Sequence, residues 1–228
     1  MFSGIIDAIG EIRSVRDAPG GKSLVVRATG YWADLKPGAS VAIDGACLTV
    51  THADAQDAQF DVIAETLRRT TLGGLRPGDR INLQKSLAVG DRIDGHFVQG
   101  HVDAVATIAE IRESGGESIW WFSLAPEASP TGQVPVSIVP KGSIAVDGIS
   151  LTVVAVRQGG FSVALIPTTL RGTTLGHKKP GARVNVETDI LARTVVQYLQ
   201  LLGVGTGPHA AAANDAAMMD LLKREGFA

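Results

Sequence analysis

Cys47 and His101 are the residues of this chain whose types and positions first suggest chemistry. The chain carries two copies of one pattern, and Cys47 of the first copy is matched by Ser150 of the second. A short segment ahead of each copy carries His101 in one case and Ile5 in the other. Thiols are nucleophiles, and histidine transfers protons near neutral pH. Reactive residues in one copy alone favour an asymmetric reaction between two similar bound molecules, although many cysteines are only small hydrophobes.

The repeat itself defines two domains. Residues 40–50, SVAIDGACLTV, return as residues 143–153, SIAVDGISLTV, a displacement of 103 positions (40 to 143). The same displacement relates ETLRRTTLG to TTLRGTTLG and PGDRINL to PGARVNV, while GIIDA returns as GHVDA after 96 positions (4 to 100). Copies of about 95 residues are too long for a solenoid, so the pattern predicts a duplicated domain with two similar small-molecule pockets.

Other motifs with catalytic or ligand-binding potential are incomplete. GGKS at 20–23 lies where a phosphate loop would need an earlier glycine that is arginine here, and it fits a hairpin turn. The glycine run 203–207 follows a helical pattern and lacks the context of a dinucleotide site. The five histidines lie at no metal-binding spacing. Ser40, His101 and Asp44 could supply a hydrolase triad, but no Gly-x-Ser-x-Gly motif is present.

Composition limits the classes of function. The 228 residues are 45% hydrophobic and 19% charged, a balance typical of globular proteins and not of disordered ones. A formal net charge of −2 argues against nucleic acid or an anionic membrane as partner, and no apolar run is long enough to span a bilayer. The N-terminus lacks the basic start of a signal peptide, and a single cysteine allows no internal disulfide, so a cytoplasmic location is expected.

Most of the chain follows a strand pattern. Short runs rich in Val, Ile and Thr alternate with polar residues, and turn signals separate them about every ten residues. The Asp-Gly pairs at 44–45 and 147–148 fit tight turns as well as functional positions, and Thr49 and Thr152 fit ordinary strand residues equally well. An all-β barrel or sandwich is predicted in each repeat, and a barrel is favoured because closure removes exposed sheet edges.

The C-terminal segment changes to a helical period. Apolar residues recur at helical spacing at Leu191, Val195, Tyr198 and Leu202. Further apolar residues lie beside them, which favours an oligomerisation helix over 189–203, with packing against its own barrel as the alternative. Residues 204–228 are predicted to form a linker and tail, with a last amphipathic helix over 215–224. Short helical turns are also expected after Glu65 and Thr168.

The chain resembles the α-type riboflavin synthase family, whose members contain a duplicated lumazine-binding barrel. The matching motifs run in order over residues 1–203: MFSGIID, CLTV, FDVIAETLRRTTLG, GDRINLQKSL, GDRIDGHFVQGHVD, KGSIAVDGISLTV, LIPTTL and VNVETDILAR. The resemblance implies two six-stranded antiparallel β-barrels in tandem, at 1–97 and 98–188, and a C-terminal helix that holds a homotrimer. Each barrel would bind one 6,7-dimethyl-8-ribityllumazine.

The implied reaction is a dismutation. One lumazine donates a four-carbon unit to another, which gives riboflavin and 5-amino-6-ribitylamino-2,4(1H,3H)-pyrimidinedione without a cofactor or metal. Some family members work beside a lumazine synthase, but no residue here indicates such docking. One alternative is a non-catalytic carrier such as the lumazine proteins of luminous bacteria, and another is a double barrel without a ligand. The intact GHVD segment and second copy favour the enzyme.

Site residues follow from the resemblance position by position. The candidates for proton transfer and nucleophile activation, with individual roles left open, are Ser40, Cys47, His101 and Asp147. The N-terminal pocket is expected to use Gly4, Ile5, Ile6, Cys47, Leu48, Thr49, Asp61, Val62, Ile63, Ala64, Glu65, Thr66, Gly100, His101 and Val102. The C-terminal pocket is expected to use Lys141, Ser150, Leu151, Thr152, Ile166, Pro167, Thr168, Thr169, Leu170 and Arg171.

Overall fold

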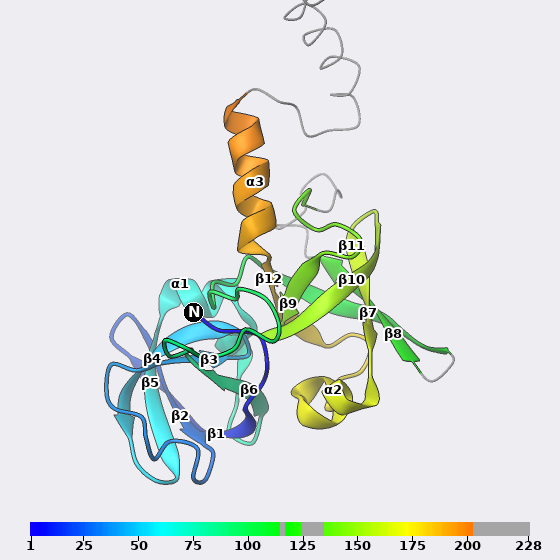
Figure 1. The fold of residues 1–228 in the computed structure, drawn as a ribbon. Helices are drawn as coiled ribbons and strands as arrows, with labels where there is room; N and C mark the ends of the chain where they lie inside the picture. The colour runs from blue at the N-terminus through cyan, green and yellow to red at the C-terminus, as the bar shows by residue number, and fades with distance from the viewer. Residues whose placement is uncertain (115–116, 125–134, 203–228) are drawn as a thin grey trace, which may run out of the picture. The chain divides into compact units, whose positions relative to one another are not determined.

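The computed structural model describes residues 1–114, 117–124 and 135–202 (Figure 1). The strands of the first copy are β1 (Ala8–Ala18), β2 (Gly21–Arg27), β3 (Ser40–Ile43), β4 (Ala46–Ala53), β5 (Asp57–Ile63) and β6 (Arg80–Lys85). Those of the second copy are β7 (Ala104–Ser114), β8 (Glu117–Leu124), β9 (Ser143–Val146), β10 (Ile149–Arg157), β11 (Gly160–Leu165) and β12 (Arg183–Thr188).

Each set of six strands closes into an antiparallel barrel. The first closes in the order β1-β2-β5-β4-β3-β6, and the second in the order β10-β11-β8-β7-β12-β9. Because β7 to β12 repeat β1 to β6 in chain order, the two orders describe one topology. The predicted all-β fold with two six-stranded barrels is therefore confirmed, and Figure 1 shows the first in blue to teal and the second in green to yellow.

Strand alternation divides each barrel into a core and an outer face. In β4, Leu48 and Val50 are buried, whereas Cys47 is half-buried and Thr49 is exposed. The core of the first barrel is filled by large side chains such as Trp32 and Phe60, and the second by residues such as Phe122. Side chains of a strand point to opposite faces in turn, so polar residues of β4 can face a ligand outside the barrel without disturbing its core.

Two short helices follow the fifth strand of each barrel. In the first copy they are α1 (Ala64–Arg69) and the 3₁₀ helix η1 (Thr71–Gly74). In the second copy they are α2 (Pro167–Gly172) and the 3₁₀ helix η2 (Thr174–His177). These elements confirm the short helices predicted near Glu65 and Thr168.

The two Asp-Gly turns form the centre of the contact between the barrels. Asp44 and Gly45 have φ values of 42° and 78°, and Asp147 and Gly148 have 45° and 78°, so both pairs make the left-handed tight turns predicted for them. A Cβ added to Gly45 would lie 2.6 Å from the backbone nitrogen of Gly148. Glycine is therefore needed here for its conformation and for the close approach of the two backbones.

Two buried asparagines link the barrels reciprocally. The Asn82 side-chain amide donates to the carbonyl of Asp147 (3.0 Å), and its oxygen accepts from the backbone nitrogen of Thr174 (2.8 Å). Asn185 makes the equivalent bond in the opposite direction, to the carbonyl of Asp44 (2.8 Å). Buried polar groups that are fully paired hold a contact in one geometry, so the barrels are related by an approximate twofold arrangement of hydrogen bonds.

The C-terminal part forms a separate unit. It begins with α3 (Ile190–Leu201), which confirms the helix predicted from the apolar spacing. The predicted linker and amphipathic helix over 204–228 lie outside the described residues. Within the part of the chain that the structure describes, none of the helices is both long and apolar enough to cross a membrane.

Candidate active site

The segments ahead of the two barrels, residues 2–7 and 98–103, are called the lead-in segments. They cross each other, and each reaches the barrel of the other copy. Phe2 and Val98 pair through two backbone hydrogen bonds, of 2.7 and 3.1 Å, and both are buried. Beyond this pair, the carbonyl of Gly100 accepts from the backbone nitrogen of Cys47 (2.8 Å) in the first barrel. The segment that precedes the second barrel therefore belongs to the pocket of the first.

The N-terminal segment makes the reverse crossing. The carbonyl of Gly4 accepts from the backbone nitrogen of Ser150 (2.7 Å), and Ile6 packs against the core of the second barrel. The expectation that residues 4–6 serve the N-terminal pocket is thus wrong, since these residues lie against the C-terminal barrel. Sequence position suggested the nearer barrel, whereas the crossing at Phe2 and Val98 exchanges the segments.

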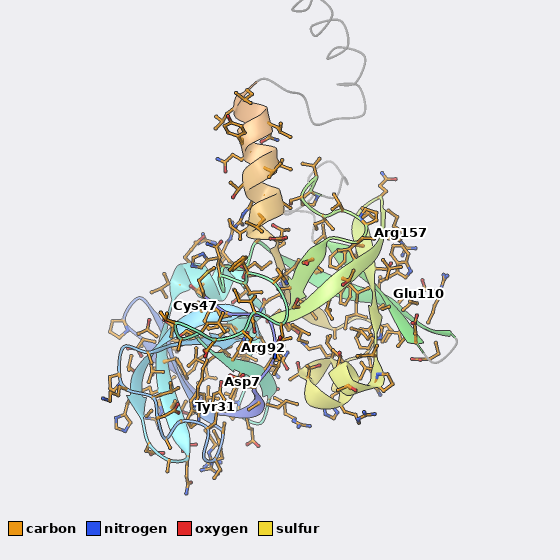
Figure 2. The ribbon with its side chains drawn as sticks, in the orientation of Figure 1. Asp7, Tyr31, Cys47, Arg92, Glu110 and Arg157 are labelled. Carbon is orange, nitrogen blue, oxygen red and sulfur yellow. The ribbon has the colours of Figure 1, made fainter. Side chains whose placement is uncertain are left out.

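A cavity of about 480 Å³ lies beside this first lead-in segment, but the cavity that holds the reactive residues is on the first barrel. That cavity measures about 470 Å³ and is lined by Ala46, Cys47, Glu65, Thr66, Arg69, Thr70, Gly100, His101 and Val102. Cys47 comes from β4, His101 from the crossing segment, and Glu65 from α1, and Figure 2 shows Cys47 on the first barrel. The structure therefore brings together Cys47 and His101, which the sequence singled out from the broken repeat.

The other residues expected in this pocket divide between the two faces of the barrel. Thr49, Asp61 and Ile63 are exposed on β4 and β5, the strands that adjoin the cavity, and Ala64 is exposed at the start of α1. Leu48 and Val62 instead point into the core. Side chains in the core contribute packing, so these two residues can meet a ligand only through their backbone.

On the second barrel, the position equivalent to Cys47 is Ser150, which is half-buried on β10. The Ser150 hydroxyl lies 2.7 Å from Nδ1 of His96, a buried histidine whose pKa is lowered by burial. A neutral imidazole can accept the hydroxyl proton, which makes this pair capable of acid–base chemistry. His96 was not among the predicted site residues, because it has no counterpart in the first copy. Its contact with Ser150 is visible only in the folded chain.

The remaining residues expected in the second pocket lie on β10, just after β11 and in α2. Thr152, Ile166, Pro167, Thr168 and Arg171 are exposed, Thr169 and Leu170 are half-buried, and Leu151 belongs to the core.

Lys141 adopts a left-handed backbone conformation, with φ of 67°, at the position where the first copy has Gly38. A non-glycine residue costs about 1–3 kcal/mol in such a conformation. Strain of this kind concentrates at functional sites, and the expectation that Lys141 contacts substrate stays a prediction.

Ser40 and Asp147 do not line the cavity that holds Cys47 and His101. Ser40 pairs with Thr49 across β3 and β4. Asp147 is fully buried at the contact between the barrels, where its side chain accepts from the backbone nitrogen of Asn185 (2.7 Å). Asp147 is thus bonded within the contact between the barrels, and its role as a proton-transfer group stays a prediction.

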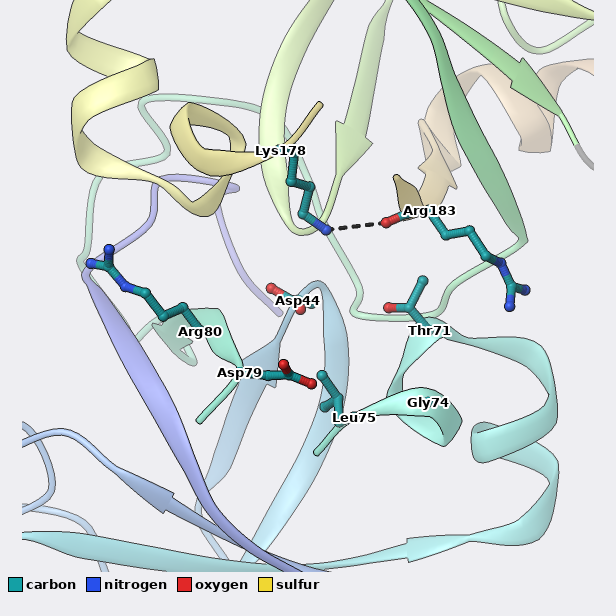
Figure 3. Close-up of a pocket in the computed structure, with 8 residues that line it drawn as sticks. All are labelled: Asp44, Thr71, Gly74, Leu75, Asp79, Arg80, Lys178 and Arg183. Atoms are coloured by element: carbon teal, nitrogen blue, oxygen red, sulfur yellow. Dashed lines mark hydrogen bonds between the residues drawn. The ribbon is translucent and has the colours of Figure 1, made fainter. Parts of the chain in front are cut away.

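A charged cavity of about 320 Å³ lies at the barrel contact (Figure 3). Its lining includes Asp44 and Lys178, and Lys178 Nζ lies 2.7 Å from Asp147 Oδ2 and donates to the carbonyl of Arg183 (3.1 Å). Burial, reinforced by the charge of Asp147, raises the pKa of Asp44 to about 8. Burial also raises the pKa of Asp147, against the opposing effect of Lys178.

The charge balance at this contact follows from those distances. One ammonium faces two buried carboxyl groups, and it is paired directly with Asp147. With a pKa of about 8, Asp44 is mostly protonated at neutral pH, whereas Asp147 has the ammonium as its direct partner. The residue of the first copy that corresponds to Lys178 is Leu75. The first copy therefore lacks this ion pair, and the two copies differ here as well.

The lead-in segments are also held by their own aspartates. Asp7 accepts from the hydroxyl of Tyr31 (2.8 Å) and from the backbone nitrogen of Lys85 (2.8 Å), and Figure 2 shows Asp7 and Tyr31 close together. Its counterpart Asp103 accepts from both the backbone nitrogen and the hydroxyl of Thr188 at 2.8 Å. Among the residues described here, no group of His, Cys, Asp and Glu side chains has the arrangement of a metal site.

Comparison with known proteins identifies the family. A family model described as "Lumazine binding domain" matches residues 3–85 and again residues 99–189. The chain therefore belongs to the lumazine-binding-domain family, with one domain match over each barrel. The two matches begin at Ser3 and Gln99, within the segments that cross between the barrels.

Full-length relatives share both domains. The chain is 42% identical over 208 residues to the riboflavin synthase of Chlamydia pneumoniae, covering 91% of this chain and 99% of that protein. It is 40% identical over 201 residues to the riboflavin synthase of Escherichia coli (strain K12), covering 88% of this chain and 92% of that protein. The crystal structure of LumP complexed with 6,7-dimethyl-8-(1'-D-ribityl) lumazine shares the fold, with a TM-score of 0.71 at 21% identity over 82% of this chain and 99% of that one.

Proposed function

We propose that this chain catalyses the riboflavin synthase reaction, in which two molecules of 6,7-dimethyl-8-ribityllumazine give riboflavin and 5-amino-6-ribitylamino-2,4(1H,3H)-pyrimidinedione. The observation that carries the proposal is the duplicated pocket: one chain offers two equivalent sites to two copies of one substrate. The riboflavin synthases of two bacteria resemble the chain along nearly their whole length. A carrier needs only one intact pocket, whereas here both copies retain polar, half-buried groups at equivalent positions, Cys47 and Ser150.

The chemistry suits a site without added electron carriers. The 7-methyl protons of a lumazine are acidic because the ring delocalises the resulting carbanion, so the substrate acts as its own electron sink. The protein has to hold two rings in register, move protons, and assist addition of a nucleophile to one ring. Holding two reactants in a near-attack geometry can lower the barrier by about 7–11 kcal/mol.

The two pockets are equipped differently for these tasks. The first pairs the Cys47 thiol with His101 in one cavity, and the second places His96 against the Ser150 hydroxyl at 2.7 Å. A thiol and a hydroxyl differ in acidity, so the two bound lumazines meet different groups. We assign proton transfer and nucleophile assistance mainly to Cys47 and His101, and substrate contacts to the outer faces of β4, β5, β10 and α2.

We place the working site between chains. Within one chain the pockets lie on opposite sides of the Phe2–Val98 pair, because the two segments run antiparallel through it. Gly4 and Gly100 are thus separated by about four residues of extended chain, or roughly 13 Å. Reacting atoms have to approach to about 3–3.5 Å. A neighbouring copy can supply that approach, and we propose a homotrimer in the cytoplasm, assembled through the apolar residues of α3.

Incubating the purified protein with 6,7-dimethyl-8-ribityllumazine tests the function directly. Riboflavin absorption and fluorescence are expected to appear, with one riboflavin for every two lumazines consumed. The reaction should proceed without added metal or nucleotide and persist after exhaustive chelation. Stable, bound lumazine without riboflavin would instead favour the carrier, and activity that a metal restores after chelation would contradict the absence of a cofactor.

Removal of α3 tests the assembly. Ending the chain after Thr188 is expected to leave barrels that fold and bind lumazine but form little riboflavin, because the facing pocket is lost. Sedimentation velocity and turnover are the measurements. In the full chain, the double substitution Leu191→Glu and Val195→Glu should have the same effect, while Gln197→Glu on the same helix serves as control. A monomeric truncated protein with full turnover would show that each chain is complete in itself.

A further inference from the structure

Glu187 is a buried carboxylate at the base of the segment that enters the first pocket. It lies on β12 with 3% of its surface exposed. One carboxylate oxygen accepts from the backbone nitrogen of Gln99 (2.6 Å), and the other accepts from those of Gly100 and His101 (2.9 Å each). Three consecutive backbone donors therefore converge on a single side chain.

The same segment lies directly on Cys47. The Gly100 carbonyl accepts from the backbone nitrogen of Cys47 (2.8 Å), and a Cβ added to Gly100 would lie 2.5 Å from that of Cys47. Gly100 also has φ of 81°, which a side chain would strain. The contacts form a continuous path from Glu187, through the backbone of Gly100, to Cys47, with His101 as the next residue along the segment.

In the other copy, a neutral side chain holds the equivalent segment. The position of Glu187 is Gln84 there, 103 residues earlier (187 to 84). Gln84 accepts from the backbone nitrogen of Gly4 (3.0 Å) and donates to the hydroxyl of Ser3 (2.8 Å). A neutral amide with one backbone contact thus suffices in the copy that carries Ile5 in place of His101.

A carboxylate at this position is energetically costly, which argues for a role beyond packing. Within the described parts of the chain, no salt bridge pairs Glu187 with a cation, and burial raises its pKa to about 7 although its three backbone donors favour the charged form. The nearby Asp103 adds a like charge. Hydrogen bonds to an ionised acceptor are about twice as strong as neutral ones, so the gain is a more rigid segment.

We propose that Glu187 is a positioning residue of the first pocket: its carboxylate fixes the backbone of residues 99–101 and so sets His101 and Gly100 against Cys47. The inference rests on the proposed function for its effect on turnover, but not for its effect on Cys47. Glutamate holds the segment that crosses to Cys47, and glutamine holds the segment that crosses to Ser150. The segment beside Cys47 is held by three backbone hydrogen bonds, whereas the segment beside Ser150 is held by one.

Alkylation of Cys47 by iodoacetamide measures this positioning without any substrate, since the chain has a single cysteine. Glu187→Gln places an amide nitrogen against backbone donors, so the segment should loosen and the alkylation rate should rise at least about tenfold, as expected for loss of hydrogen bonds to a charged group. Gln84→Glu, the reverse exchange at the equivalent position, is the matched control and should leave the rate within about twofold.

Turnover gives the second measurement. Glu187→Gln should lower kcat about tenfold or more with a smaller change in KM, because the groups that it misplaces act mainly in the transition state. Glu187→Asp, which keeps the charge, should recover part of both losses and also serves if Glu187→Gln fails to fold. Unchanged alkylation in both Glu187 variants would overturn the proposal. A wild-type chain that forms no riboflavin would refute the proposed function and leave the alkylation result to decide the positioning role.

Discussion

Replacing His101 by alanine is expected to lower kcat by about 10²–10⁴-fold, the contribution typical of a positioned proton-transfer group. Affinity for lumazine should change only a few-fold, because interactions that form only in the transition state affect rate and not ground-state binding. Cys47→Ser should follow the same pattern with a smaller loss, since it keeps the size and hydrogen-bonding capacity that Ser150 has in the other copy. Steady-state kinetics and equilibrium titration with lumazine separate the two effects.

A histidine on the strand that carries Cys47 provides the control. His52 lies on β4, is exposed, and is paired in register with Gln59 rather than placed in the cavity. His52→Ala should therefore leave both kcat and affinity unchanged, which excludes a general effect of losing a histidine. Parallel losses of affinity and kcat in His101→Ala would make His101 a binding group, and no loss at all would move the chemistry to the second pocket.

The fold could be predicted from the sequence because its signals are local and occur twice. Alternation along residues 46–50 places Leu48 and Val50 inside, and the Asp-Gly pair at 44–45 closes the preceding hairpin. Each of these signals recurs in the second copy with the same spacing. A duplicated pattern that meets local propensity at every element leaves few alternative topologies.

The sequence could predict site residues only where the two copies differ at a single position. Comparison of the copies singled out Cys47 and His101, and the structure places both in one cavity. The exchange of the lead-in segments could not be read from spacing, because it depends on one non-local pair, Phe2 with Val98. His96 was missed for the same reason, since its partner Ser150 is 54 positions away in the chain.

The contact between the barrels carries the second large expected effect, on stability. Asp147→Asn should destabilise the protein by about 3 kcal/mol, the lower end of the cost of leaving one partner of a buried ion pair without the other. Lys178 would then remain near the barrel contact without the carboxylate that lies 2.7 Å from it. Urea unfolding at pH 7, followed by tryptophan fluorescence, measures the change.

Asp44→Asn is the matched substitution across the approximate twofold, and its effect should be small at about pH 4 and change as the pH rises. Burial raises the pKa of Asp44 to about 8 in the folded chain. A carboxyl whose pKa is raised by folding stabilises the native state fully below its unfolded pKa, and this stabilisation is lost as the pH rises through the folded pKa. Asparagine resembles the protonated form and can still accept from the backbone nitrogen of Asn82.

Between about pH 4 and pH 8 the wild-type chain should therefore lose stability relative to Asp44→Asn, and near pH 9 the variant should be the more stable of the two. Asp147→Asn should be destabilised throughout this range, because Lys178 stays charged. Equal losses from both substitutions at pH 7 would show that the two carboxyl groups share the ammonium equally. The duplicated turns are alike in backbone, so a difference between these variants would arise from Lys178, which the first copy replaces by Leu75.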